Sequence, residues 1–491
     1  MKDALKKLQF ELHCYGQAEG VLMCDGETAA PRGAAEARGE VMAFLSQKRY
    51  ELLVNDETRK LLDTLWEKKD ELDGETVRQV EILREDLDEL TRIPMEEYAA
   101  YGKLVNNSSA AWVKAKETND YALFEPYLKQ IVEYTQRFAH YHRADLPAYE
   151  SQLDSYEKGM STAMLDPFFG MLRKELVPML DMAKSLPPQP AFVSKPCAIS
   201  AQREFSSWLM DVIGLDKNRC SIAETEHPFT SGMNRSDVRI TTHYYENAVL
   251  SSLYSVVHEG GHALYELGVA PEYQFSVLGR TSSMSLHESQ SRFYENLIGH
   301  SAGFLRFIAP KMREFFPDMM QGVTDRDLFR AVNHVQPSLI RIEADQVTYP
   351  LHIMVRYELE KQLMAGTLST RDLPEAWNAL YKEYLGVDVP NDSQGVLQDT
   401  HWAGGMIGYF PTYALGSAYA SQMLHAMQRD LDTDALIERG DIAPITAWLG
   451  DRIHRHGSRY EPNDLLKMAT GEEFNPAYYV KHLQQVLSNL A

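Results

Sequence analysis

The chain has 491 residues, of which 44% are hydrophobic and 24% charged, the proportions of an ordinary soluble globular protein. Its formal net charge is -21, from 70 acidic against 49 basic residues. Such a charge repels phosphate backbones, so we expect no nucleic-acid partner.

The chain lacks the patterns of a membrane or secreted protein. Its first residues, MKDALKKLQF, form a charged amphipathic pattern with no apolar signal-peptide core, and no stretch reaches 18 uninterrupted apolar residues. Four cysteines without a C-x-x-C pair do not make a disulfide framework (Cys14, Cys24, Cys197 and Cys220). We therefore expect no membrane contact and a cytoplasmic location.

The first 183 residues predict charged scaffold helices, as in the leucine-spaced segment from Thr58 to Leu90. The segment SLPPQPAFVSKP, residues 185–196, is rich in proline and cannot be helical throughout. We predict a boundary there, with residues 1–190 as an N-terminal lobe or lid and residues 191–491 as the catalytic region. One continuous structural unit is the alternative.

Residues 236–245, SDVRITTHYY, alternate apolar and polar side chains and predict a short strand. The next segment, residues 252–268, predicts an amphipathic helix. The fold class expected is therefore mainly α with a small sheet. The strand is a candidate to hold a peptide by main-chain hydrogen bonds at a sheet edge.

The predicted helix carries the pattern H-E-x-x-H. His258 and His262 are four residues apart, so both imidazoles project from one helix face and can bind one ion. Glu259 lies beside them and is the candidate general base, which implies metal-assisted hydrolysis. The alternative for this motif alone is two core histidines on an apolar helix.

A hydrolytic zinc site uses three protein ligands, so a third is expected on another element. The segment SSMSLHESQSRFYENLIGHS has a serine-led helix start followed by Glu288, the favoured ligand. His287 and Glu295 are its rivals. Two histidines and one carboxylate suit Zn²⁺, and they also accept Co²⁺ or Mn²⁺.

Two glycines, Gly260 and Gly261, stand inside the predicted helix, although each costs roughly 1 kcal/mol relative to alanine there. We predict that the substrate or a neighbouring backbone approaches the helix at these positions, where side chains would obstruct it.

The segment from Gly395 to Gly416 contains five glycines among aromatic residues and is typical of a loop that closes over a substrate. His401 or Tyr409 is the candidate donor to the oxyanion of a tetrahedral intermediate. Tyr413 is the alternative to Tyr409. The competing interpretation is that Tyr413 only packs within an aromatic cluster.

Several blocks together resemble the Taq-type thermostable metallocarboxypeptidases: HPF, DVRIT, HEGGH, HESQS, IRIEAD and GVLQDTHW, which begin at residues 227, 237, 258, 287, 340 and 395. Near the start, MCDGETAAPRG departs from that family's pattern, since Cys24 stands where the family often has tryptophan. The resemblance implies a two-lobed helical fold with a deep groove, similar to neurolysin and angiotensin-converting enzyme.

The resemblance also implies a homodimer that removes single residues from peptide C-termini with broad side-chain preference. It implies zinc held by His258, His262 and Glu288, with Glu259 as the base. An oligopeptidase that cuts inside short peptides and a non-enzymatic metal-binding scaffold are the competing functions.

A carboxypeptidase must bind a free carboxylate, which arginine does best. By spacing alone, Arg341 forms an i,i+4 salt bridge with Asp345 on a predicted helix. The resemblance instead makes Arg341 the first candidate for the carboxylate and places His227 near the substrate. Arg239 is the second candidate, or a structural ion pair on its strand.

Overall fold

The computed structural model describes residues 1–183 and 185–490. In the N-terminal region the helices are α1 (Lys2–Thr28), α2 (Ala35–Leu53), α3 (Asp56–Glu67), α4 (Gly74–Arg92), α5 (Met95–Thr118), α6 (Glu125–His142), α7 (Ala148–Tyr156) and α8 (Thr162–Ala183). The middle region contains α9 (Ile199–Ile213), β1 (Cys220–Glu224), β2 (Thr230–Asn234), β3 (Asp237–Thr242), α10 (Val249–Gly268), α11 (Met284–Arg292), α12 (Ala302–Phe315), α13 (Pro317–Met320) and α14 (Asp325–Val332). The remaining helices are α15 (Tyr349–Met364), α16 (Leu373–Leu385), α17 (Pro411–Met427), α18 (Thr433–Glu438), α19 (Ala443–Arg452), α20 (Pro462–Thr470) and α21 (Ala477–Leu490).

The mainly helical fold with a small sheet is confirmed. The predicted helix over residues 252–268 is α10, which begins three residues earlier, and the predicted strand is β3. The sheet has the order β1-β3-β2, in which β3 pairs parallel with β1 and antiparallel with β2, so β2 is an edge strand. The sequence did not predict β1 and β2, because CSIAE and TSGMN lack a regular apolar alternation.

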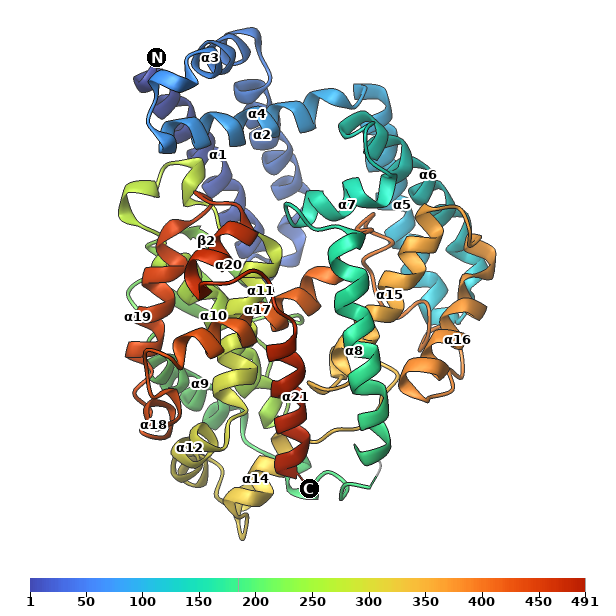
Figure 1. The fold of residues 1–491 in the computed structure, drawn as a ribbon, viewed down its shortest axis with the longest axis vertical. Coiled ribbons are helices and arrows are strands. Elements are labelled where there is room, and N and C mark those ends of the chain that lie inside the picture. The colour runs from blue at the N-terminus through green and yellow to red at the C-terminus, as the bar shows by residue number, and fades with distance from the viewer. Residues whose placement is uncertain (184, 491) are drawn as a thin grey trace.

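Helices α1 to α4 form the upper part of the molecule, α9, α12, α18 and α19 lie on one side, and α15 and α16 lie on the other (Figure 1). Two hydrophobic clusters hold this arrangement together. The smaller joins the N-terminal helices to residues 269–278, and the larger runs from Leu104 to Leu490. Residues 104–183 thus share a core with the helices beyond residue 191, and the domain division at residue 190 stays a prediction.

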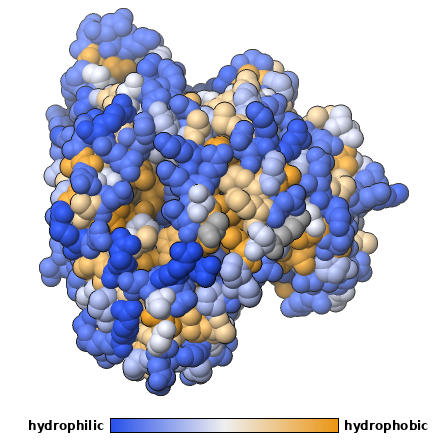
Figure 2. Space-filling model, turned by 60° about the horizontal axis from the view of Figure 1, so that its bottom comes forward, coloured by the Kyte–Doolittle hydropathy of each residue, from blue (hydrophilic) through white to orange (hydrophobic). Residues whose placement is uncertain are grey.

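A cavity of about 960 Å³ opens between the N-terminal helices and the edge strand β2, with Gly232 and Glu266 in its wall. The space-filling view shows hydrophilic side chains over most of one face and hydrophobic residues gathered in its hollow part (Figure 2). Among the helices of residues 1–183 and 185–490, none is both long enough and apolar enough to cross a membrane. The four cysteines are all free thiols.

Candidate metal centre

The two glycines of α10 allow the helices of the centre to pack closely. A Cβ atom on Gly261 would lie 2.6 Å from the carbonyl oxygen of Gln290 and 2.8 Å from Cα of Ser291, both in the backbone of α11. A Cβ on Gly260 would clash with the side chain of Ile213 instead. Of the two reasons predicted for the glycines, the close approach of a neighbouring backbone is confirmed for Gly261, whereas Gly260 faces a side chain of α9.

We expect Gly261→Ala to lower the free energy of unfolding by about 1–3 kcal/mol, since the added methyl group meets backbone that cannot rotate away. Gly39→Ala in α2 is a matched control, because nothing lies within 4 Å of a Cβ added there. That control should leave stability unchanged or raise it by up to about 1 kcal/mol. Thermal unfolding of both variants measures the difference, and equal stability would contradict the packing argument.

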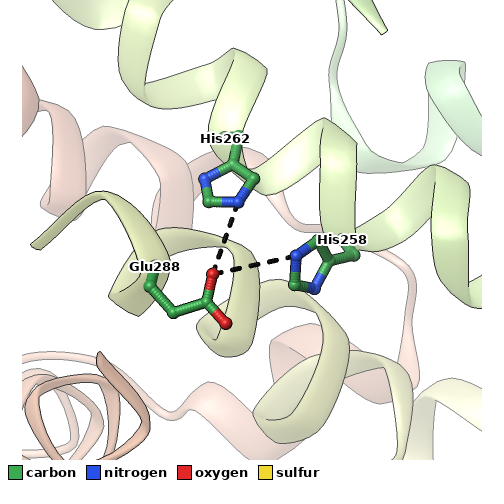
Figure 3. A group of neighbouring side chains, drawn as sticks. All are labelled: His258, His262 and Glu288. Atoms are coloured by element: carbon green, nitrogen blue, oxygen red, sulfur yellow. Dashed lines mark ion pairs between the residues drawn. The ribbon is translucent and has the colours of Figure 1, made fainter. Parts of the chain in front are cut away.

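Three candidate metal ligands meet between α10 and α11. His258, His262 and Glu288 each offer one ligand atom, and these atoms lie within 4.8 Å of one another. Oε2 of Glu288 is 3.9 Å from Nε2 of His258 and 3.5 Å from Nε2 of His262 (Figure 3). Two imidazole nitrogens and a carboxylate oxygen that converge on one point fit a divalent metal ion of the zinc type.

The local sequence explains how Glu288 is presented. Ser283 caps α11, with its Oγ accepting a hydrogen bond of 3.1 Å from the backbone N–H of Leu286, which confirms the serine-led helix start. Nε of Arg292, one helical turn after Glu288, lies 2.7 Å from Oε1 of Glu288. Burial alone would raise the pKa of Glu288, but the Arg292 guanidinium and the histidines hold it well below its ordinary value. The carboxylate is therefore ionised, as a metal ligand must be.

The two rivals for the third ligand lie behind the histidines and outside the ligand group. Oε2 of Glu295, on the π-helical segment Phe293–Gly299, is 2.7 Å from Nδ1 of His258. Nδ1 of His287 is 2.5 Å from Nδ1 of His262, and its Nε2 is 2.9 Å from Glu266. Partners on the far nitrogen orient a metal-binding imidazole, which is the arrangement seen here.

These partners act differently on the two histidines. Burial by itself would lower the pKa of His258, but the Glu295 carboxylate raises it to about 9. Burial and the neighbouring His287 lower the pKa of His262 to about 3. His262 is thus neutral and ready to bind an ion, whereas His258 must release a proton when it does so.

We expect Glu295→Gln to weaken metal binding about 10–100-fold, because it removes the carboxylate that orients His258. A titration of the metal-free protein against a competing chelator measures this affinity. Glu438→Gln is a matched control, since Glu438 forms an exposed pair with Arg306 at 3.0 Å, away from the centre. An unchanged affinity in Glu295→Gln would show that this carboxylate does not support the ligand.

Glu259 is buried beside the ligand group, with a hydrogen bond of 2.6 Å from Oγ1 of Thr230 to its Oε2. Thr230 is the first residue of the edge strand β2, so the strand and the candidate base are directly connected. Burial raises the pKa of Glu259, which brings it closer to neutral pH. The sequence did not single out Thr230, because its strand carries no recognisable pattern.

Arg341 does not form the i,i+4 salt bridge with Asp345 that spacing alone offered as the alternative to substrate binding. It lies in a single 3-10 turn, Arg341–Glu343, and its Nη2 is 2.8 Å from Oδ1 of Asp399. Asp345 instead accepts hydrogen bonds from the backbone N–H groups of Val347 and Thr348. The i,i+4 prediction was wrong because the chain is not helical between these residues, so the two side chains do not share a face.

Asp399 is shared between two buried arginines. Nε of Arg356, whose side chain is fully buried, donates a hydrogen bond of 2.8 Å to Oδ2 of Asp399. Nη1 of Arg341 also donates to the hydroxyl of Tyr349 at 3.2 Å, and the ring of Tyr349 faces the Arg292 guanidinium at 4.7 Å. Two guanidinium groups against one carboxylate leave one positive charge, which can attract a substrate carboxylate.

The other candidates lie in simpler surroundings. Arg239 on β3 forms an ion pair of 2.9 Å with Asp237, the structural pair that the sequence offered as its alternative. His227 is exposed in the segment before β2. Neither observation tests a role in substrate binding.

The aromatic segment after Gly395 brings its candidates together. Nε2 of His401 is 3.1 Å from the hydroxyl of Tyr413, and the rings of Tyr409 and Tyr413 are 5.2 Å apart. Burial lowers the pKa of His401 to about 4, so its imidazole is neutral at pH 7. Nδ1 of His401 is buried without a hydrogen-bond partner among the described residues.

A mainly helical fold with an H-E-x-x-H helix and a candidate carboxylate ligand on the following helix is typical of a metallopeptidase. The chain belongs to the carboxypeptidase Taq (M32) metallopeptidase family, whose model matches residues 4–487. It is therefore a metal-dependent carboxypeptidase, a hydrolase that acts on peptides.

Relatives match along nearly the whole chain. Carboxypeptidase 1 of Bacillus subtilis is 38% identical over 491 residues, covering 99% of this chain and 97% of the relative. Thermostable carboxypeptidase 1 of Thermus thermophilus is 36% identical, covering 94% of this chain and 93% of the relative. The crystal structure of an M32 carboxypeptidase from Deinococcus radiodurans superimposes with a TM-score of 0.96 at 35% identity, covering 99% of each chain.

Proposed function

We propose that this carboxypeptidase holds Zn²⁺ with His258, His262 and Glu288, and that it removes single residues from peptide C-termini with broad side-chain preference. The observation that carries the metal assignment is the convergence of these three ligand atoms within 4.8 Å. A bound zinc ion supplies a Lewis acid that polarises the scissile carbonyl and lowers the pKa of water. Co²⁺ or Mn²⁺ would suit the same ligands.

Glu259 is the proposed general base and, later in the reaction, the general acid. Its buried carboxylate takes a proton from the attacking water and passes it to the leaving amine. The raised pKa supports this exchange, because it makes the carboxylate a stronger proton acceptor than an ordinary glutamate. Thr230 orients the carboxylate through its 2.6 Å hydrogen bond.

Arg341 is the proposed anchor for the C-terminal carboxylate of the peptide. Asp399 and Arg356 hold its guanidinium in place, and the surplus positive charge of the three groups favours an anion. Arg239 is the second candidate for this role, and His227 is proposed to lie near the bound peptide.

His401 and Tyr409 are the proposed donors to the oxyanion of the tetrahedral intermediate, and Tyr413 is the alternative tyrosine. The free Nδ1 of His401 supports its part, since an unpartnered buried nitrogen is available to a ligand. We further propose a homodimer, as the family resemblance implies, and a cytoplasmic location, which the four cysteines without a disulfide framework favour.

The test is to incubate the metal-loaded protein with one N-terminally blocked peptide, supplied as the free acid and as the C-terminal amide, and to follow products by mass. Stepwise loss of single residues from the free acid alone is the expected result. Equal internal cleavage of both forms would indicate an oligopeptidase. No turnover with metal bound would refute the catalytic proposal, and Glu259→Gln excludes a contaminating peptidase.

A further inference from the structure

Glu360 is a buried carboxylate on α15 that the proposed reaction does not use. Its side chain is fully buried and accepts three hydrogen bonds. Nε1 of Trp402 donates to Oε1 at 2.8 Å, and the backbone N–H of Gly408 and the hydroxyl of Tyr149 donate to Oε2 at 2.9 and 3.0 Å. Burial raises the pKa of Glu360 to about 7, and its three hydrogen bonds fix the positions of their donors relative to one another whether or not it carries a proton.

Two of the three donors are the ends of one loop. Trp402 directly follows His401, and Gly408 directly precedes Tyr409. A single carboxylate therefore holds both ends of the segment that separates the two proposed oxyanion donors. Gly408 has a φ of 92°, a left-handed conformation that favours glycine, so the approach of its N–H to Glu360 depends on that residue type.

Helix α7 also contacts this loop and Tyr409 beside it. It supplies Tyr149 to Glu360, and a Cβ on Gly408 would lie 3.1 Å from Cβ of Gln152. Tyr156, at the end of α7, packs its ring edge-to-face against Tyr409 at 5.2 Å. Both α7 and α15 therefore hold the loop, and Glu360 is the polar group that connects it to both helices.

We propose that Glu360 is a positioning residue for the carboxypeptidase reaction, which holds the loop from Trp402 to Gly408 so that His401 and Tyr409 face the reacting carbonyl. This inference rests on the roles proposed above for His401 and Tyr409. The hydrogen bonds of Glu360 go to Trp402, Gly408 and Tyr149, and not to the proposed metal ligands. Glu360 acts only through the loop, and its loss should impair the transition state more than substrate binding.

The test is Glu360→Gln in the metal-loaded protein. Glutamine keeps the shape but offers one acceptor oxygen, so its amide NH₂ must face at least one of the former donors. We expect kcat to fall about 10–100-fold, as for a small misplacement of catalytic groups, while KM changes less than about threefold. Metal affinity should stay that of the unmodified protein.

Trp402→Phe tests the same contact from the other partner, since it removes the indole N–H and leaves Glu360 in place. It should also lower kcat. This variant tests the proposal if Glu360→Gln does not fold. Tyr149→Phe frees no part of the loop and should have a smaller effect than either. Thermal unfolding of each variant shows that the compared proteins are folded.

A double-mutant cycle separates positioning from a general loss of structure. If Glu360 acts through Tyr409 and His401, adding Glu360→Gln to a Tyr409→Phe, His401→Asn variant should lower kcat little further. The inference would be overturned if folded Glu360→Gln kept full kcat or if it lost metal in parallel with activity. It would also be overturned if Glu360→Gln lowered kcat by the same factor in the Tyr409→Phe, His401→Asn background as in the unmodified protein. Full kcat in Tyr409→Phe, His401→Asn would instead refute the proposed oxyanion donors, on which the inference depends.

Discussion

Glu259→Gln is expected to lower kcat/KM for a free-acid peptide by about 10²–10⁴-fold, the range by which a positioned general base accelerates proton transfer. Glutamine has the size of glutamate and still accepts the hydrogen bond from Thr230, but it takes no proton. The metal ligands are untouched, so the variant should bind metal as before. Single-turnover hydrolysis and metal content of the same preparation measure the two properties together.

Thr230→Val is the companion variant, because it removes the 2.6 Å hydrogen bond and leaves the carboxylate in place. Its loss of activity should be much smaller than that of Glu259→Gln. Activity near the unmodified level in metal-loaded Glu259→Gln would rule this carboxylate out as the base.

Arg341→Gln is expected to lower kcat/KM for free-acid peptides about 100-fold, the loss typical of one partner of a buried hydrogen-bonded charge pair. Turnover of the corresponding C-terminal amides, which is low at the outset, should hardly change. The variant should therefore lose most of its preference for a free C-terminal carboxylate but keep its low activity on amides. The ratio of kcat/KM for acid and amide forms of one peptide is the measurement.

The loss in Arg341→Gln can be attributed to the missing guanidinium for two reasons. Asp399 keeps its contact with Arg356 when Arg341 is removed, so no unpaired carboxylate is left in the interior. Arg239→Gln is the matched control, since it removes the second candidate guanidinium and its ion pair with Asp237. If Arg239→Gln lost the preference for free-acid over amide peptides and Arg341→Gln kept it, Arg239 would be the residue that binds the substrate carboxylate.

Features that depend on neighbours in the chain could be predicted from the sequence. The α10 helix, its H-E-x-x-H spacing and the serine cap of α11 all lie within a few helical turns, where backbone geometry places the side chains. The candidate ligand Glu288 was favoured for the same reason, because it follows a recognisable helix start. These features were local, and local geometry determined them.

Contacts between distant segments were decided by tertiary packing alone. Asp399 lies 58 residues from Arg341, whereas helical spacing could offer only the local pairing of Arg341 with Asp345 as an alternative to substrate binding. Thr230 reaches Glu259 across 29 residues, from a strand without an apolar pattern. Glu360 holds a loop more than 40 residues away. The sequence by itself thus determined which residues stand on α10 and α11. Only the packing of helices and loops decided which buried charges meet, because such a pair forms where two segments distant in the chain are buried against each other.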